Sequence, residues 1–211
     1  MTPLWDTLDP FEPNTKALME NHVLTWTAHP DANPFDILRT KIYLLMREHN
    51  WTRLAITSPD KSCGKPTMAC NLAVGFTRQH ELKSILLEFD LRRPGVARCL
   101  GMEPKHDIAA LVQGEVSAEA QMQRLRDNVA LSAALSSVPD PTRLLLADKT
   151  AKLLDTLQSD FQPDVMIFDL PPMLCTDDAR ATLRNVDCAL IIAAAEQTRM
   201  GQLDLCEREV A

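Results

Sequence analysis

Four continuous apolar segments recur along the chain, separated by polar stretches in which apolar residues have helical spacing. Continuous runs of this kind are typical of strands that are buried on both faces of a parallel sheet. The predicted strands are residues 54–57, 84–90, 164–170 and 188–195, with a weaker fifth at 128–135. The predicted intervening helices are residues 67–79, 108–113, 149–158 and 178–185. This alternation predicts an α/β fold with a doubly wound, mostly parallel sheet flanked by helices.

The first fifty residues follow a different pattern. Residues 1–33 are rich in Pro, Asp and Asn, and we expect them to form an irregular N-terminal arm. Residues 34–49 have apolar side chains at helical spacing, which predicts a helix packed on the sheet edge or on a neighbouring subunit. Residues 34–211 are expected to form a single domain that ends in a helix begun near Met200 and lacks a final strand.

Composition excludes some classes of function. The net charge of -7 argues against a nucleic-acid binder, which would need a basic face. No apolar run reaches the roughly 18 residues of a membrane-spanning helix, and the N-terminus lacks the pattern of a signal peptide. The six cysteines form no C-x-x-C pair, so the sequence gives little support for a zinc site or for disulfide bonds. We therefore expect a cytoplasmic protein without a nucleic-acid partner.

One connection between a predicted strand and helix resembles a loop that binds phosphate. The strand at residues 54–57 runs into the dipeptide Gly64-Lys65 and then into a helix. In such a loop, backbone N–H groups surround the phosphates and the lysine supplies a positive charge. The predicted nucleotide-binding residues are Lys61, Ser62, Cys63, Gly64, Lys65, Pro66, Thr67 and Met68.

Pro66 departs from this pattern. The residue after the lysine normally supplies a Ser or Thr hydroxyl to Mg²⁺ and directs its backbone N–H at a phosphate. Proline has neither group, although its fixed φ suits the first turn of a helix. The sequence is therefore compatible with a nucleotide-using enzyme or with a relative that has lost part of the machinery.

Two later strands end in carboxylates. Glu88 and Asp90 stand at the end of one predicted strand, and Asp169 stands at the end of another. The carboxyl ends of parallel strands meet at one edge of a sheet, where a centre for phosphate and metal would lie. The Gly-Lys turn together with these acids predicts a nucleotide site at this edge.

Three segments resemble the signature motifs of the bacterial tyrosine kinases. They are Thr57-Ser58 before the loop, residues 86–94 (LLEFDLRRP), and residues 167–172 (IFDLPP) with Asp178-Ala179. These kinases are P-loop proteins of capsule and exopolysaccharide synthesis, related to the deviant Walker ATPases of the ParA/MinD type. The resemblance extends from Phe35 to the C-terminus and implies that residues 34–211 form a P-loop NTPase-like domain.

The resemblance implies an activity and a role for each matching residue. ATP or ADP would bind with Mg²⁺, and the γ-phosphate of ATP would be transferred to a protein tyrosine. Lys65 would neutralise the β- and γ-phosphates, and Thr67 would cap the loop. Glu88 and Asp90, both usually Asp, would act near Mg²⁺ and the incoming hydroxyl. The implied catalytic residues are Lys65, Glu88, Asp90 and Asp169, and the implied metal-binding residues are Thr67, Asp90 and Asp169.

The resemblance also implies partners. A membrane polysaccharide co-polymerase, which regulates chain length, would bring the protein to the inner face of the membrane. The family forms homo-oligomers through one Glu and two Arg, of which only Arg39 is present, with Asn33 and Asp36 at the other two places. The family's C-terminal tyrosine cluster is absent, since Tyr43 is the single tyrosine.

Two alternatives to kinase activity remain open. The first is a catalytically silent or weak nucleotide-binding module that docks on the co-polymerase, and Pro66 favours it. The second is a ParA/MinD-type ATPase, which would have its signature lysine at position 60. Here that residue is Asp60, and Lys61 lies one place away, so this alternative ranks last.

Overall fold

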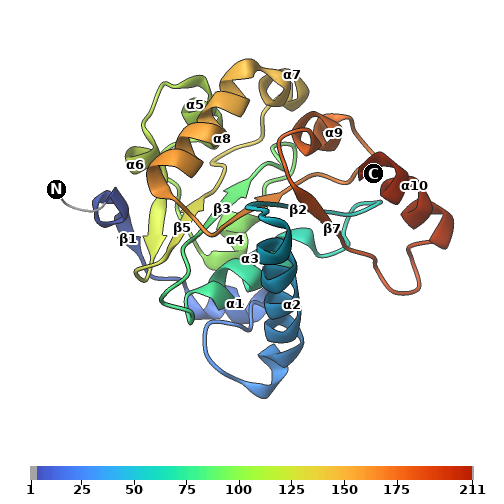
Figure 1. The fold of residues 1–211 in the computed structure, drawn as a ribbon, viewed down its shortest axis with the longest axis horizontal. Helices are drawn as coiled ribbons and strands as arrows, with labels where there is room; N and C mark the ends of the chain where they lie inside the picture. The colour runs from blue at the N-terminus through green and yellow to red at the C-terminus, as the bar shows by residue number, and fades with distance from the viewer. Residues whose placement is uncertain (1–3, 211) are drawn as a thin grey trace.

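Residues 4–210, the part of the chain that the computed structural model describes, form one central sheet with helices on both faces (Figure 1). The strands are β1 (Asp9–Phe11), β2 (Arg53–Thr57), β3 (Ser84–Glu88), β4 (Gln123–Leu125), β5 (Val129–Ser132), β6 (Val165–Asp169) and β7 (Cys188–Ile191). Their order in the sheet is β1-β4-β5-β3-β6-β2-β7. All neighbours pair in parallel except β4 and β5, which are antiparallel. The predicted fold class is confirmed, and each predicted strand overlaps one of β2, β3, β5, β6 and β7.

Helices on the two faces come from different parts of the chain. The helices are α1 (Thr15–Glu20), α2 (Asn33–His49), α3 (Lys65–Phe76), α4 (Val96–Leu100), α5 (Ile108–Gln113), α6 (Ala118–Gln121), α7 (Pro141–Leu146), α8 (Asp148–Phe161), α9 (Asp178–Leu183) and α10 (Met200–Val210), with 3-10 turns η1 (Leu4–Thr7) and η2 (Pro30–Ala32). Helices α1 to α4 lie on one face, α5 to α8 lie on the other, and α9 and α10 flank β7 (Figure 1). The helices α1, α4, α6 and α7, each of four to six residues, were not predicted.

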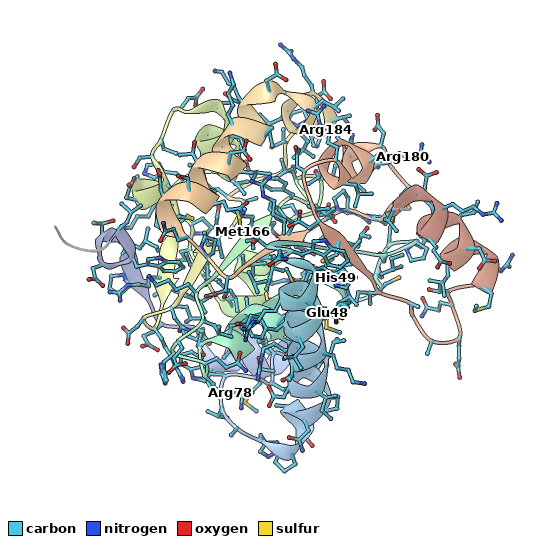
Figure 2. All side chains as sticks on the ribbon, viewed as in Figure 1. Glu48, His49, Arg78, Met166, Arg180 and Arg184 are labelled. Atoms are coloured by element: carbon cyan, nitrogen blue, oxygen red, sulfur yellow. The ribbon has the colours of Figure 1, made fainter. Side chains whose placement is uncertain are left out.

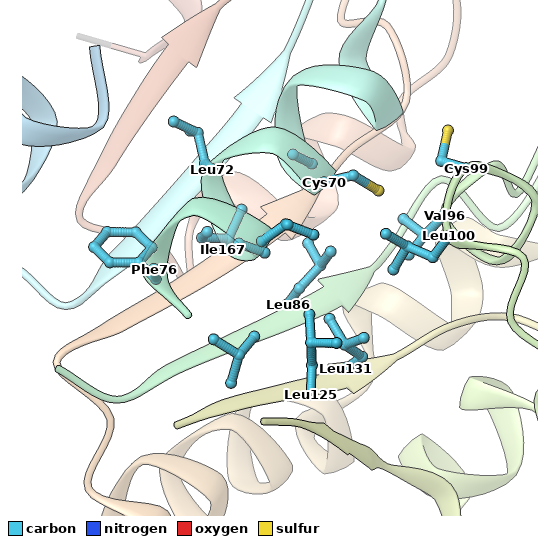
Figure 3. Packing of buried hydrophobic residues seen from close by; sticks show 14 of the residues in the cluster. Cys70, Leu72, Phe76, Leu86, Val96, Cys99, Leu100, Leu125, Leu131 and Ile167 are labelled. Carbon is cyan, nitrogen blue, oxygen red and sulfur yellow. The ribbon is translucent and has the colours of Figure 1, made fainter. Parts of the chain in front are cut away.

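The sheet separates two hydrophobic cores because side chains alternate along each strand. Leu86 and Ile167 contact the core beneath α3 and α4, where Leu72 and Phe76 also pack (Figure 3). The neighbouring Leu87, by contrast, belongs to the core under α8. Burial of both faces explains why these strands read as continuous apolar runs.

The N-terminal segment is more regular than the irregular arm that its composition predicts. Strand β1 pairs in parallel with β4, which places it at one edge of the sheet. Trp5 and Leu8 are buried, and the indole Nε1 of Trp5 donates to the carbonyl of Phe161 at 2.8 Å. Two buried apolar residues in a polar segment and a strand of three residues are too short a pattern to show a period in the sequence. The division of the chain at residue 33 stays a prediction.

Helix α2 packs against α3 and shares a hydrophobic cluster with residues of β2 and of the edge strand β7. Tyr43 meets Phe76 edge-to-face at 6.4 Å between ring centroids. Arg39 is buried and donates to Asp36 at 2.5 Å, and Arg78 donates to the same carboxylate. The arginine that the resemblance assigns to subunit contacts is therefore engaged within the chain.

Buried apolar side chains gather on the sheet, and polar and charged side chains lie mostly at the outside. Met166 lies within the sheet, whereas Arg180 and Arg184 project from the region of α9 (Figure 2). Among residues 4–210, no helix combines the length and the apolar character needed to cross a bilayer.

Replacing Trp5 tests whether the N-terminal segment is integral to the fold. Trp5→Ala removes a buried indole, and we expect the free energy of unfolding to fall by about 3–5 kcal/mol. Trp5→Phe, which loses mainly the hydrogen bond to Phe161, should cost about 1 kcal/mol. Urea denaturation followed by circular dichroism measures both, with the exposed Thr7→Ala as a control from the same 3-10 turn. A Trp5→Ala variant as stable as Thr7→Ala would show that the segment is dispensable.

Candidate functional site

The loop between β2 and α3 has the backbone conformation of a phosphate-binding turn. Gly64 has a left-handed φ of 88°, and Ser62 has a φ of 60°. A Cβ at Gly64 would meet nothing within 4 Å, so glycine is required there for its conformation and not for space. The hydroxyl of Ser58 donates to the carbonyl of Asp60 at 2.6 Å and braces the start of the loop. The strand, turn and helix predicted around Lys65 are all present.

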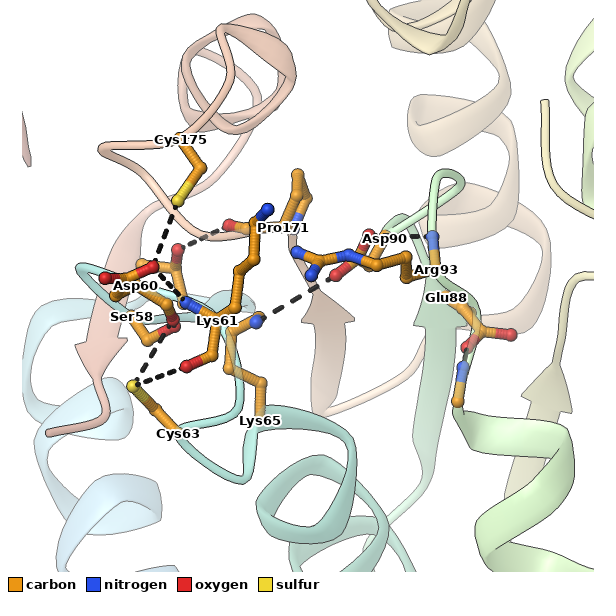
Figure 4. Close-up of polar contacts among 12 residues, drawn as sticks. Ser58, Asp60, Lys61, Cys63, Lys65, Glu88, Asp90, Arg93, Pro171 and Cys175 are labelled. Atoms are coloured by element: carbon orange, nitrogen blue, oxygen red, sulfur yellow. Dashed lines mark hydrogen bonds and ion pairs between the residues drawn. The ribbon is translucent and has the colours of Figure 1, made fainter. Parts of the chain in front are cut away.

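Lys65 and Asp90 face each other across the carboxyl edge of the sheet. Lys65, the first residue of α3, is 4% exposed, and its Nζ lies 3.9 Å from Oδ2 of Asp90 (Figure 4). Asp90 also accepts a hydrogen bond from the backbone N–H of Arg93 at 3.2 Å. Burial raises the pKa of Asp90, while the charge of Lys65 opposes the rise. These two predicted site residues are thus brought together.

Asp169 is the last residue of β6 and pairs in register with Glu88 of β3. Its side chain is fully buried, and neither carboxylate oxygen has a hydrogen-bond partner among the described residues. Burial raises the pKa of Asp169 well above its usual range, the nearby Glu88 adds to the rise, and Lys65 opposes it. A buried carboxyl group of this kind needs a proton or a cation to balance it.

Glu88 has a different role from the one that the sequence predicts. One carboxylate oxygen accepts from the N–H groups of Gly95 and Val96, the latter at 2.7 Å, and the other accepts from Ala134 at 2.8 Å. Burial raises the pKa of Glu88, and these three bonds oppose the rise. Because both oxygens are occupied by backbone donors, Glu88 holds the start of α4. The geometry does not support the predicted action of Glu88 on Mg²⁺ or on an incoming hydroxyl.

Pro66 packs directly against the segment that Glu88 holds. A Cβ placed on Gly95 would lie 2.9 Å from Cγ of Pro66, so the proline ring occupies the space over this glycine. Beside it, Thr67 is half-buried and lines the same cleft. The position that would carry the metal-binding hydroxyl is therefore filled by an apolar contact, whereas Thr67 borders the cleft.

A cleft of about 470 Å³ opens between the loop and the start of α4. Its lining residues are Ser62, Gly64, Lys65, Pro66, Thr67, Asp90, Arg93, Pro94, Gly95 and Arg98. Arg98 was not predicted, because the short helix α4 that presents it was not recognised. Two cations three and eight residues after Asp90, Arg93 and Arg98, are the signal that could have identified this wall.

The other predicted binding residues border the loop without entering the cleft. Lys61 is exposed, and its N–H donates to Oδ1 of Asp60 at 2.7 Å. The thiol of Cys63 donates to the carbonyl of Asp60 at 3.3 Å. Met68 is half-buried against the core on the α3 side of the sheet, so its side chain faces away from the cleft. A separate hollow of about 360 Å³ beside α9 and β7 has neither the loop nor the strand-end carboxylates.

Comparison with known proteins identifies relatives of this chain. A scan against models of known protein families found no match. The tyrosine-protein kinase YwqD of Bacillus subtilis is 26% identical over 191 residues, which is 90% of this chain and 80% of that protein. The tyrosine-protein kinase wzc of Salmonella typhi is 25% identical over 76% of this chain, but the match spans only 23% of that protein. The chain is related to the bacterial tyrosine kinases.

Solved structures share the fold. The kinase domain of the Escherichia coli tyrosine kinase ETK has a TM-score of 0.77 at 23% identity, over 85% of this chain and 70% of that one. The chimerical protein CapA2B2 has a TM-score of 0.79 at 19% identity, over 96% and 85%. Cobyrinic acid a,c-diamide synthase from Mycobacterium smegmatis, with a bound ATP analogue and magnesium, has a TM-score of 0.62 at 20% identity, over 76% and 65%. These likenesses extend from tyrosine kinase domains to a nucleotide-dependent enzyme of the same architecture.

Asp169→Asn should stabilise the protein at neutral pH. The pKa of Asp169 is raised on folding, so the folded state binds more protons than the unfolded state above about pH 4. The free energy of unfolding contributed by this group therefore falls as pH rises. The amide has no such titration, so the variant's gain in melting temperature should grow from about pH 4 to about pH 7. We expect it to reach at least about 2 °C, the shift that about 1 kcal/mol gives in a domain of this size.

Thermal denaturation at several pH values measures this difference. Asp160→Asn, at an exposed position on α8, is the matched control and should leave the melting temperature unchanged at every pH. A less stable Asp169→Asn variant at neutral pH would show that the buried carboxylate is compensated in a way that the contacts of Asp169 do not reveal.

Proposed function

We propose that this protein binds ATP or ADP in the cleft beside Lys65. The observation that carries the proposal is the joint placement of the left-handed Gly64 turn, the buried Lys65 and two strand-end carboxylates at one sheet edge. Backbone N–H groups of residues 62–65 would surround the phosphates, and Lys65 would neutralise them. The nucleotide-bound enzyme of the same fold supports this use of the cleft.

The reaction that we propose is transfer of the γ-phosphate to a tyrosine hydroxyl of a protein, as the names of the relatives describe for them. The tyrosine oxygen bonds to the γ-phosphorus, the bond to the β–γ bridging oxygen breaks, and ADP leaves. Asp90 stands where it could accept the hydroxyl proton, and burial raises its pKa toward that role. Positioning and charge neutralisation supply most of the rate in such transfers.

Mg²⁺ fits this site through a reduced set of protein ligands. The two unpartnered, buried oxygens of Asp169 are the feature that fits a cation, and Asp90 lies near them at the same edge. Glu88 does not join them, since both of its oxygens accept from backbone N–H groups, whereas Thr67 lines the cleft and could contribute its hydroxyl. Residues 4–210 contain no cluster of three or more His, Cys, Asp or Glu side chains that could hold a metal. Magnesium often takes only one or two carboxylates together with phosphate and water, and when bound it supplies positive charge to the phosphates.

A regulatory module that binds nucleotide without turnover is the second candidate. Pro66 favours it because the loop lacks one N–H and one hydroxyl, and the engagement of Glu88 with backbone donors removes a second group from the chemistry. Whether the protein is a kinase or a regulatory module, it would dock on a membrane polysaccharide co-polymerase at the cytoplasmic face. The resemblance implies this partner. A ParA/MinD-type ATPase ranks last because Asp60 accepts hydrogen bonds from Lys61 and Cys175 where that class would have its lysine.

The phosphate acceptor would belong to another molecule. Tyr43 is the single tyrosine, and its ring packs between Phe76 and the guanidinium of Arg47 on α2. The internal use of Arg39 also weakens the case for a homo-oligomer built on the family's contact. The proposal is therefore of a protein that acts on a partner.

Titration calorimetry with Mg-ATP and Mg-ADP tests the nucleotide site. Lys65→Ala should weaken binding by about 10- to 150-fold, the equivalent of one charge-assisted hydrogen bond. Lys65→Met keeps the buried aliphatic stem and should show the same loss of affinity, so the loss comes from the missing charge and not from a cavity. Lys152→Ala, an exposed lysine on α8, is the control. Equal affinity in the Lys65 variants and the wild type would refute the site, and labelled phosphate on a tyrosine peptide would separate the kinase from the silent module.

Pro66→Ser should strengthen nucleotide binding. The substitution restores a backbone N–H toward the phosphates and a hydroxyl for Mg²⁺, and it relieves the contact with Gly95. We expect affinity for Mg-ATP to rise by at least about tenfold, or roughly 1.4 kcal/mol, and to depend more on Mg²⁺. Pro66→Ala, which restores only the N–H, separates the two contributions in the same calorimetric assay. An unchanged affinity in Pro66→Ser would mean that the wild-type loop already makes these contacts by another route.

A further inference from the structure

The wall of the cleft opposite the loop carries two guanidinium groups. Arg93 and Arg98 both line the cleft and both are exposed. Among residues 4–210, neither side chain takes part in an ion pair, although the chain has a net charge of -7 and six other arginines are paired with acids. Lys65 lies at the base of the same cleft. Three cations from three segments thus face one space.

Gly95 places the head group of Arg98 beside Pro66. A Cβ on Gly95 would lie 2.9 Å from Cγ of Pro66 and 3.9 Å from Nη2 of Arg98. The proline ring and the guanidinium therefore border the same glycine. Position 66 is the place in the loop where a hydroxyl would help to hold a metal against the phosphates. The guanidinium of Arg98 stands next to that place.

The helix that presents Arg98 is held rigidly. Glu88 caps its first turn through Gly95 and Val96, and the carbonyl of Leu100 accepts from the backbone N–H of Asn14 at 3.0 Å. The carbonyl of Arg98 itself accepts from the side-chain amide of Asn21 at 3.4 Å. The backbone of Arg98 is therefore fixed from both ends, while its side chain stays free to meet a ligand.

We propose that Arg98, assisted by Arg93, binds the terminal phosphates of the nucleotide on the side where Pro66 has removed a metal ligand. This inference rests on the proposed nucleotide binding and adds two residues to it. A guanidinium offers a planar fork of N–H donors that matches phosphate oxygens and keeps its charge at any physiological pH. Nucleotide binding by this protein therefore depends less on Mg²⁺ than a loop with Ser or Thr after its lysine would.

Calorimetry with ATP in magnesium and in EDTA tests the inference on four proteins. The wild type should lose less than about threefold in affinity when magnesium is removed, because its arginines supply the charge. Arg98→Ala should bind ATP at least about tenfold more weakly in EDTA, the loss of one charge-assisted contact. Arg98→Lys should fall between the two, since it keeps charge without the fork. Arg208→Ala, an exposed arginine on α10, should match the wild type.

The outcomes separate this inference from the function on which it rests. Arg98→Ala within about twofold of the wild type in both buffers would overturn the role of Arg98 while leaving nucleotide binding intact. A wild type that binds ATP only with magnesium would overturn the reduced metal dependence. Inorganic triphosphate serves as a second probe. If the wild type binds triphosphate through Arg98 but does not bind ATP, the phosphate subsite stands and the proposed nucleotide function fails.

Discussion

Three buried carboxylates share the carboxyl edge of this sheet with one buried cation. Glu88, Asp90 and Asp169 are buried at the same edge as Lys65. A charged side chain buried in a protein interior is costly unless an opposite charge or hydrogen bonds compensate it. Each acid meets this constraint differently. Glu88 accepts hydrogen bonds from three backbone N–H groups. Asp90 pairs with Lys65 and accepts from one backbone N–H, and Asp169 has no hydrogen-bond donor among the described residues. The path of the loop after β3 and the position of α4 follow from this division.

Much of the fold could be read from the sequence because the strands are buried on both faces. The apolar run that became β2 leads into the loop that carries Lys65, and the runs that became β3 and β6 end near Asp90 and at Asp169. Their pattern therefore predicts both the sheet and the edge that carries the site. The N-terminal strand and β4 escaped detection because three-residue strands leave no period. Their place in the sheet depends instead on distant contacts, such as that between Trp5 and Phe161.

The roles within the site were harder to predict than its location. Glu88 and Asp90 stand two residues apart at the end of one strand, and their residue types are nearly the same. The one additional methylene of Glu88 lets its carboxylate reach the N–H groups of Gly95, Val96 and Ala134, whereas Asp90 stays beside the lysine. The sequence contains no signal for this difference, because the donors are placed by the turn that follows β3 and by the next strand of the sheet.

The contact between Pro66 and Gly95 links two positions that are 29 residues apart in the chain. Gly95 has a φ of -137°, which any residue can adopt, so its backbone does not require glycine. The requirement comes from the proline ring, which leaves no room for a methyl group. A chain with Ser at position 66 could carry Ala at 95, whereas a chain with Pro at 66 could not. During evolution, glycine would therefore have to be present at position 95 before proline could appear at position 66.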